Sequence, residues 1–416
     1  MNRFKKFLIF LQRPDNLSVY VYMIAIGLFI TPYLLRQQFI SIYSSRTYLW
    51  ALNYIALFAL FLVALYNILN KNTTIWYLFP AFSIIVLLPT QLTYPIQWGT
   101  IFVFICCCII PQYIIFAEFN IPKRNVIIRH FLIFFNTIIF ILFITALIDK
   151  LFDRFIIKQL ADLFSCDSGI AGFAYPKDNE HNRFFSIFGH PLTNAFLFNF
   201  CYTLNILYNK SHKILLPNYV WAIITLFSLI CCGGKTGITI GIIITIITFF
   251  RKWQFYALSI TLIPIAYISG LLDVLIYRFT KIPLTSGRIT GLLLLFEDDR
   301  IPLRFFLGHG SQLDTVYIGE QFSFLSTSRE FPLIDHALRY GILFALLLLL
   351  PPFIYVTIRL WREKRFTDWF FWCLLYAEIN TYNGFSSRLD VSFIFYFLTF
   401  ILLNITVCDN HSRISD

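Results

Sequence analysis

Long apolar stretches recur along almost the whole chain, and they constrain the fold more than any other feature of the sequence. A helix that crosses a membrane needs about 20 consecutive apolar residues. Windows of this kind predict about twelve spans. They cover 17–35, 47–69, 76–92, 97–117, 131–149, 191–208, 216–232, 237–250, 254–273, 337–358, 369–386 and 390–408. The sequence therefore predicts an all-α, polytopic integral membrane protein whose residues 1–416 form a single membrane domain.

The composition excludes most other classes of protein. Hydrophobic residues make up 58% of the chain and charged residues only 13%. Soluble domains are about a quarter charged, so this chain cannot cover a surface that faces water. Soluble enzymes and nucleic-acid binders are excluded on this ground, and β-barrels are excluded because the apolar runs have the length of membrane-spanning helices. The 9 cysteines form no CxxC pair and lie mostly in apolar runs, which indicates packing residues rather than disulfides or a metal site.

The distribution of Lys and Arg predicts which ends of the spans face the cytoplasm. With both termini inside, the inner segments hold about half of the cations but only about a quarter of the acids. This difference accounts for the whole formal charge of +11. The positive-inside rule therefore favours an N-in, C-in topology, and the basic excess reports membrane orientation rather than binding of nucleic acid.

Two of the predicted outer connections are long, at about 150–190 and 274–336. Long ordered loops usually carry function, so we expect the active face on the outer side. The first loop ends in a segment that runs from Arg183 to Gly189-His190-Pro191. One interpretation is a helix entrance, with His190 as a polar cap and proline in the first turn. The other places Arg183 and His190 at the mouth of a cavity that faces an anionic headgroup.

A very short outer turn, Cys231-Cys232-Gly233-Gly234-Lys235, joins two predicted spans. It lacks the spacing and the strand context of a phosphate-binding P-loop. Lys235 is either an interfacial lysine that extends its ammonium group to water or a functional cation at membrane depth.

The second long loop carries the densest set of candidate residues. Arg288 precedes a short apolar run at 289–296, which predicts an interfacial helix that begins at this arginine. Arg304 follows, and His309 lies in a Leu-Gly-His-Gly turn where glycine permits close approach of backbone amides to an anion. The acidic run at 297–299 favours a solvated patch over a metal site.

His336 and Arg339 open the predicted span at 337–358. They are three residues apart and so share a helical face. The nearby guanidinium group favours a neutral imidazole, which is the form that a general base needs. A capping histidine is the plainer alternative. Arg388, between the last two predicted spans, adds one more outer cation.

These motifs, in this order and with this topology, resemble the O-antigen ligase/polymerase superfamily of bacterial polysaccharide assembly. The resemblance covers about 183–345. It lies in the cation after Gly233-Gly234, the Ser-Gly-Arg of Arg288, the Leu-Gly-x-Gly turn and the histidine at a helix start. The segment before Pro191 also looks like that family's Arg…Phe-Gly-Asn/His-Pro sequence.

The resemblance implies a glycosyl transfer without a metal or another cofactor, at the outer face of the cytoplasmic (inner) membrane. The donor is a glycan on undecaprenyl pyrophosphate, and a polymerase extends a lipid-linked repeat unit. By position, His336 and Arg288 are the implied catalytic residues. The implied diphosphate- and glycan-binding residues are Lys235, Arg183, His190, Arg304, His309, Arg339 and Arg388. A chain-length regulator and a flippase of the same pathway are the implied partners, besides membrane lipid.

The sequence departs from the family pattern at two positions, Lys235 and Ala337. Lys235 stands where the family has arginine, and an ammonium group cannot form the two-pronged contact of a guanidinium group with a phosphate. Ala337 stands where the family often has asparagine. Two alternatives to a polymerase fit the sequence: a ligase that transfers the glycan to lipid A-core or to a protein, and a flippase for lipid-linked oligosaccharides.

Overall fold

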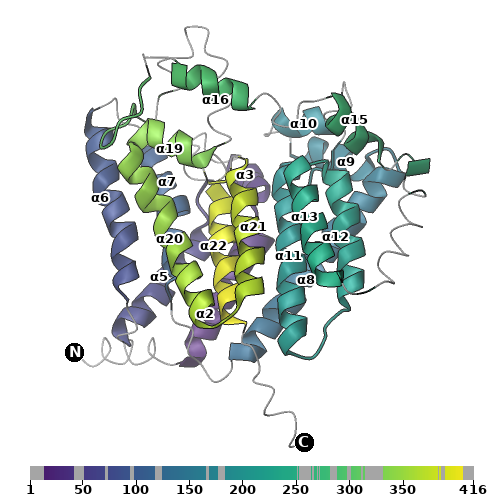
Figure 1. Cartoon of the computed structure of the whole chain (residues 1–416), viewed down its shortest axis with the longest axis horizontal. Helices are drawn as coiled ribbons and strands as arrows, with labels where there is room; N and C mark the ends of the chain where they lie inside the picture. Colours follow the sequence, from purple (N-terminus) through teal and green to yellow (C-terminus); the bar gives the residue numbers. More distant parts are fainter. Residues whose placement is uncertain are drawn as a thin grey trace, which may run out of the picture. The chain divides into compact units, whose positions relative to one another are not determined.

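The computed structural model describes most of the chain. The described residues are 14–41, 51–70, 74–93, 98–117, 124–164, 168–176, 183–250, 252, 264, 267–268, 270, 272–281, 288–297, 301–310, 313, 331–382, 384–385 and 389–405. All regular secondary structure in this part of the chain is helical (Figure 1). The all-α prediction is therefore confirmed.

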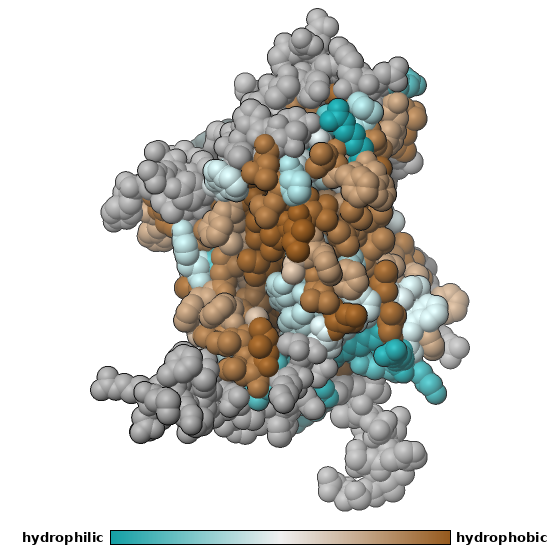
Figure 2. Space-filling model, turned by 90° about the vertical axis from the view of Figure 1, so that its left-hand side faces the viewer, coloured by the Kyte–Doolittle hydropathy of each residue, from teal (hydrophilic) through white to brown (hydrophobic). Residues whose placement is uncertain are grey.

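Two of the described helices are long and apolar enough to cross a membrane, α8 (Arg124–Leu151) and α20 (Ile342–Arg362). Several shorter apolar helices accompany them, and hydrophobic side chains occupy much of one face of the molecule (Figure 2). On α6 (Leu78–Thr93), for example, Phe82, Ile85 and Leu92 are exposed. Exposed apolar side chains in such number indicate a surface that contacts lipid.

Every predicted span except 254–273, most of which lies outside the described residues, coincides with described helices. Several of the coinciding spans are not continuous α-helices. The span at 17–35 is broken into α2 (Pro14–Ile30) and α3 (Tyr33–Ser41), which are bent by 74°. Pro32 causes the break, because proline disfavours helical geometry in the residue before it. The span at 97–117 begins as α7 (Trp98–Phe104) and continues as a π-helical turn (η2, Ile105–Ile109) and a 3-10 turn (η3, Ile110–Ile114).

The helices divide into two compact units. The first unit comprises Met1–Ile127, Gly287–Phe370 and Ile379–Asn404. Within it α2 packs on α5 (Tyr54–Leu69), α6 on α20, and α22 (Leu389–Asn404) on η2 and η3. A Cβ atom on Gly27 would lie 2.8 Å from the backbone nitrogen of Ala56, so glycine allows α2 and α5 to touch through their backbones.

The second unit comprises Ile128–Ser286, Phe371–Glu378 and Ile405–Asp416. Its described elements are α8, α9 (Phe155–Leu163), α10 (Ser168–Ala174), α11 (Pro191–Ser211), α12 (Asn218–Cys232), α13 (Lys235–Phe249) and α15 (Asp273–Lys281), with part of α21 (Phe366–Asn380). α11 packs against both α12 and α13 and is buried on nearly all sides. Its polar side chains therefore need partners inside the unit, and Asn205 exchanges hydrogen bonds with Asn136 of α8.

The described parts of the two predicted long loops include short helices. α9 and α10 lie in the first, and α15 and α16 (Arg288–Glu297) lie in the second. The helix expected to begin at Arg288 is confirmed. The prediction that His336 opens the tenth span is wrong, because His336 lies in a separate helix, α19 (Pro332–Tyr340). Gly341, with φ of +98°, separates α19 from α20, and this backbone conformation favours glycine.

Candidate functional site

Helix α19 carries two of the predicted site residues and holds both in its buried face. Pro332 occupies the first turn, and the carboxylate of Asp335 lies near the positive end of the helix dipole. Four residues on, the Nε of Arg339 donates a 2.9 Å hydrogen bond to Oδ1 of Asp335. Both side chains of this ion pair are almost fully buried.

His336 lies between this ion pair's residues in the sequence and is 1% exposed. Its Nε2 is 2.9 Å from the carbonyl oxygen of Phe385. A carbonyl oxygen can only accept a hydrogen bond, so Nε2 carries the proton and donates it. Nδ1 then has the lone pair, and it has no hydrogen-bond partner among the described residues. The rings of Phe104 and Phe344 pack around the imidazole, with centroids 5.4 and 6.2 Å away.

Burial lowers the pKa of His336, so its imidazole is neutral at neutral pH. From the sequence, the charge of Arg339 was expected to favour this neutral form. The guanidinium group contributes in that direction, but it is the smallest of the causes. The charge of Asp335 and the hydrogen bond to Phe385 act the other way. Desolvation by the surrounding aromatic rings, rather than the guanidinium group, is therefore the main reason for the neutral imidazole.

The Leu-Gly-His-Gly turn docks on the end of α19. The backbone amide of His309 donates to Leu338 O at 2.7 Å, and that of Gly310 donates to Arg339 O at 2.9 Å. The expectation that these amides face an anion is therefore wrong, because the unpaired carbonyls at a helix C-terminus already accept them. The imidazole of His309 is buried and its Nε2 lies 2.9 Å from Pro302 O. Burial lowers its pKa.

Three further predicted cations belong to the first unit. Arg304 O accepts a 2.9 Å hydrogen bond from Ile342 N, and its side chain is exposed. Arg288 begins α16, but its side chain lies outside the described part of the structure, as does all of Arg388. The structure thus places His336 and Arg339 on one helix, α19, and holds the turn of His309 against the end of that helix.

Lys235, Arg183 and His190 belong to the second unit. α12 ends at Gly233, whose φ is +62°, and Lys235 is the first residue of α13. The ammonium group of Lys235 lies 5.8 Å from the centre of the Phe279 ring on α15. This geometry is that of a cation–π contact at a half-buried site.

His190 caps α11, as the plainer of the two sequence interpretations predicts. Its Nδ1 accepts a 3.2 Å hydrogen bond from the amide of Leu192, and Pro191 occupies the first turn. Arg183 lies at the start of the same segment, with its guanidinium carbon 5.5 Å from the centre of the Phe173 ring. Phe184 N donates to Cys231 O at 2.9 Å, which ties the segment to the end of α12.

One polar group that the sequence analysis did not select is Glu378 of α21, which is 2% exposed. The Nδ2 of Asn199 lies within 3.1 Å of both carboxylate oxygens and also donates to Gly237 O. The sequence signal was an acid inside an apolar span, which is a functional hypothesis by default.

A second missed group is the ion pair of Arg36 and Asp390 in the first unit. The Nη2 of Arg36 lies 2.8 and 2.9 Å from the two carboxylate oxygens of Asp390, and Nη1 donates to Thr31 O at the break between α2 and α3. The two residues are 354 positions apart, so no sequence pattern connects them.

No group of three or more His, Cys, Asp or Glu side chains with the arrangement of a metal site occurs within the described residues. Comparison of the chain with protein-family models, with curated proteins and with solved structures finds no match.

Proposed function

We propose that this chain is a multi-pass protein of the cytoplasmic membrane that polymerises a surface polysaccharide such as O-antigen, capsule or exopolysaccharide. It transfers the glycan from undecaprenyl pyrophosphate to a lipid-linked repeat unit at the outer membrane face. The observation that carries the proposal is the state of His336. Its protonated Nε2 is oriented by Phe385 O, and its buried Nδ1 has a lone pair with no partner among the described residues.

This arrangement supplies a general base. The acceptor hydroxyl transfers its proton to Nδ1 while its oxygen bonds to the anomeric carbon of the donor glycan. The bond from that carbon to the diphosphate oxygen breaks, and the diphosphate leaves with the electron pair. A positioned base of this kind contributes about 10²- to 10⁴-fold to a rate.

The diphosphate gains negative charge as it leaves, so fixed cations stabilise the transition state. Arg288 remains our candidate for this role. Arg339 is assigned a different one, because its ion pair with Asp335 and the backbone contacts of the Gly-His-Gly turn fix the end of α19. We therefore treat Arg339 and His309 as positioning residues.

Two other functions, those of a ligase and of a flippase, would give different products in the experiment below. A ligase uses the same chemistry with lipid A-core or a protein as acceptor. A flippase makes no new bond, and Glu378 is the observation that favours it, because buried acids inside spans often serve in transport.

Product analysis separates the three functions. Purified protein in nanodiscs receives lipid-linked repeat units with a labelled glycan, and the products are resolved by chain length. The proposal predicts a ladder of longer lipid-linked glycans that disappears with Arg288→Lys and His336→Gln and persists with Glu378→Gln. A labelled glycan on lipid A-core or protein assigns a ligase. Translocation without a new bond, lost in Glu378→Gln, assigns a flippase.

A further inference from the structure

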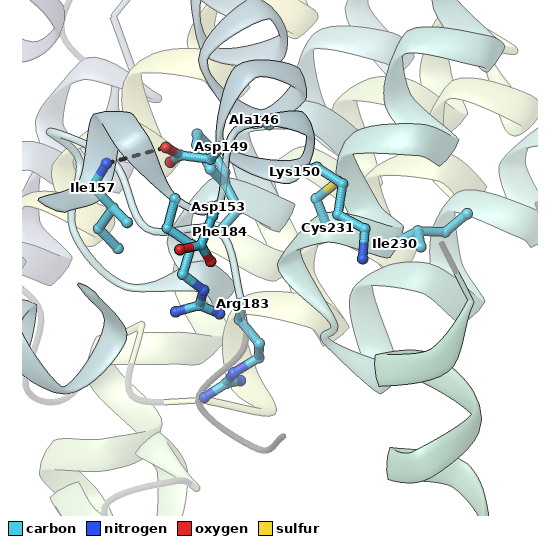
Figure 3. Close-up of a pocket in the computed structure, with 10 residues that line it drawn as sticks. Ala146, Asp149, Lys150, Asp153, Ile157, Arg183, Phe184, Ile230 and Cys231 are labelled. Atoms are coloured by element: carbon cyan, nitrogen blue, oxygen red, sulfur yellow. Dashed lines mark hydrogen bonds between the residues drawn. The ribbon is translucent and has the colours of Figure 1, made fainter. Parts of the chain in front are cut away.

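A cavity of about 150 Å³ lies in the second unit, at the C-terminal end of α8 (Figure 3). Its polar lining consists of five charged side chains. They are Asp149, Lys150, Asp153, Arg154 and Arg183. Only Arg183 among them was predicted as a site residue, and none of the five belongs to the site around His336.

The two acids of the lining are partly occupied by other contacts. Oδ1 of Asp149 accepts hydrogen bonds from the amides of Ile156 and Ile157, at 2.6 and 3.1 Å, and so caps the start of α9. Asp153 pairs with Lys158 at 2.7 Å, and its side chain is 90% exposed. Both carboxylates also interact electrostatically with Arg154. Three cations still face two acids, so the lining carries a net positive charge.

The two guanidinium groups are held in place by one residue of α10. Arg154 donates a hydrogen bond to the carbonyl oxygen of Phe173, and the guanidinium group of Arg183 lies over the ring of the same residue. Guanidinium groups that are already fixed lose little conformational entropy when they bind an anion.

Lys150 and Asp149 complete the lining from the last turn of α8. Figure 3 shows the ammonium end of Lys150 on the side of the cavity formed by Cys231 and Ile230. Asp149 is 8% exposed, and its Oδ2 is a buried oxygen with no hydrogen-bond partner among the described residues. A buried oxygen of this kind requires a donor from a ligand or from water, since an unpaired buried polar atom costs about 1–3 kcal/mol.

We propose that this cavity binds an anionic sugar residue. The cations contact its negatively charged group, and Oδ2 of Asp149 accepts a hydrogen bond from a neighbouring hydroxyl. A simple anion would satisfy the cations but would leave Oδ2 facing a like charge, whereas a charged sugar supplies both an acceptor and a donor. The inference rests on the proposed function, because it assigns an acidic residue to the glycan that the protein handles.

The test measures binding and not transfer. The full-length protein in nanodiscs of uncharged lipid is titrated with glucuronate, glucose and inorganic phosphate, and each dissociation constant is determined by isothermal titration calorimetry. We expect glucuronate to bind at least about ten-fold more tightly than glucose and than phosphate. Lys150→Gln should weaken glucuronate binding about ten-fold, which corresponds to about 1.4 kcal/mol. Lys281→Gln removes the same charge from the exposed end of α15 and should have no effect.

Asp149→Asn tests the hydroxyl contact. The variant keeps an oxygen that can cap α9 and replaces Oδ2 with an NH₂ donor, so it should weaken glucuronate binding and leave phosphate binding equal or stronger. Equal binding of glucose and glucuronate, unchanged binding in Lys150→Gln, or tighter binding of phosphate than of glucuronate would each overturn the inference. A protein that makes polymer but does not bind glucuronate refutes only this inference. A protein that binds glucuronate but makes no polymer refutes only the proposed polymerase.

Discussion

The backbone amide of His309 donates a 2.7 Å hydrogen bond to the carbonyl oxygen of Leu338. This contact joins the Gly-His-Gly turn of the second long loop to the last turn of α19, two residues beyond His336. The neighbouring bond from Gly310 N to Arg339 O extends the contact. The turn therefore supports the helix that carries the candidate base. It does so through backbone atoms, which come this close because Gly308 has no side chain.

The first prediction concerns Gly308. A Cβ atom at this position would lie 2.3 Å from the carbonyl carbon of Arg339, a distance that real side chains do not reach. Gly308→Ala should therefore displace the turn, lower the free energy of unfolding by about 1–3 kcal/mol and reduce polymerisation. Thermal unfolding in detergent and chain-length analysis measure the two effects.

Gly172→Ala is the matched control, because a Cβ atom there meets nothing within 4 Å. It also lies inside a helix, where alanine is favoured over glycine. It should be neutral or slightly stabilising. Similar behaviour of the two alanine variants would show that the turn does not pack tightly on α19.

The second prediction concerns the buried ion pair of Asp335 and Arg339. Removal of one partner leaves an uncompensated charge, so Arg339→Gln should destabilise the protein by about 3–5 kcal/mol. The double variant Asp335→Asn/Arg339→Gln removes both charges and should recover much of this loss. Chemical unfolding of the single and double variants gives the coupling energy. A double variant that is as unstable as the sum of both single variants would contradict the account.

The third prediction follows from the lowered pKa of His336. The unfolded chain binds a proton near the ordinary value of 6.5, whereas the buried imidazole resists protonation. The stability that this group contributes is therefore fully present above about pH 6.5 and decreases as the pH falls through the folded pKa. Unfolding measured between pH 8 and pH 5 should show this loss, and His336→Gln should remove part of it. The pKa of His309 is also lowered by burial, so His309→Gln should remove a further part.

The fourth prediction is the topology. If the loops at 150–190 and 274–336 lie outside, single cysteines at Ser165 and Ser311 in a cysteine-free background should react with a membrane-impermeant thiol reagent in intact spheroplasts. A cysteine at Lys364, on the predicted inner side, should react only after lysis. The reverse pattern of labelling would invert the topology.

The apolar windows predicted the helices well, because span length and burial are both set by runs of apolar residues. They missed breaks that depend on single residues. Pro32 bends the first span, and Gly341 separates α19 from α20. A hydropathy window averages over such positions, so it began the tenth span at Ala337, which lies inside the separate helix α19.

The candidate site could be predicted only in part. The sequence selected His336 and Arg339, which both lie on α19, and His309, whose backbone amide bonds to the end of the same helix. It could not identify Phe385 O as the hydrogen-bond partner of His336. This acceptor is a backbone carbonyl 49 residues away, and every residue type has such a group. The sequence also credited the neutral imidazole to Arg339, because the rings of Phe104 and Phe344 that desolvate His336 are brought against it only by packing.

The chemical step at His336 tests the central claim most directly, and its measurement is the fifth prediction. His336 is buried, so each variant must first be shown to bind the lipid-linked donor and to unfold cooperatively. The single-turnover rate of glycan transfer is then compared between the wild type and His336→Gln, which fills similar space but cannot take up a proton at neutral pH. The account predicts a rate lower by about 10²-fold or more with donor binding nearly unchanged. A folded His336→Gln protein that transfers glycan at the wild-type rate would contradict it.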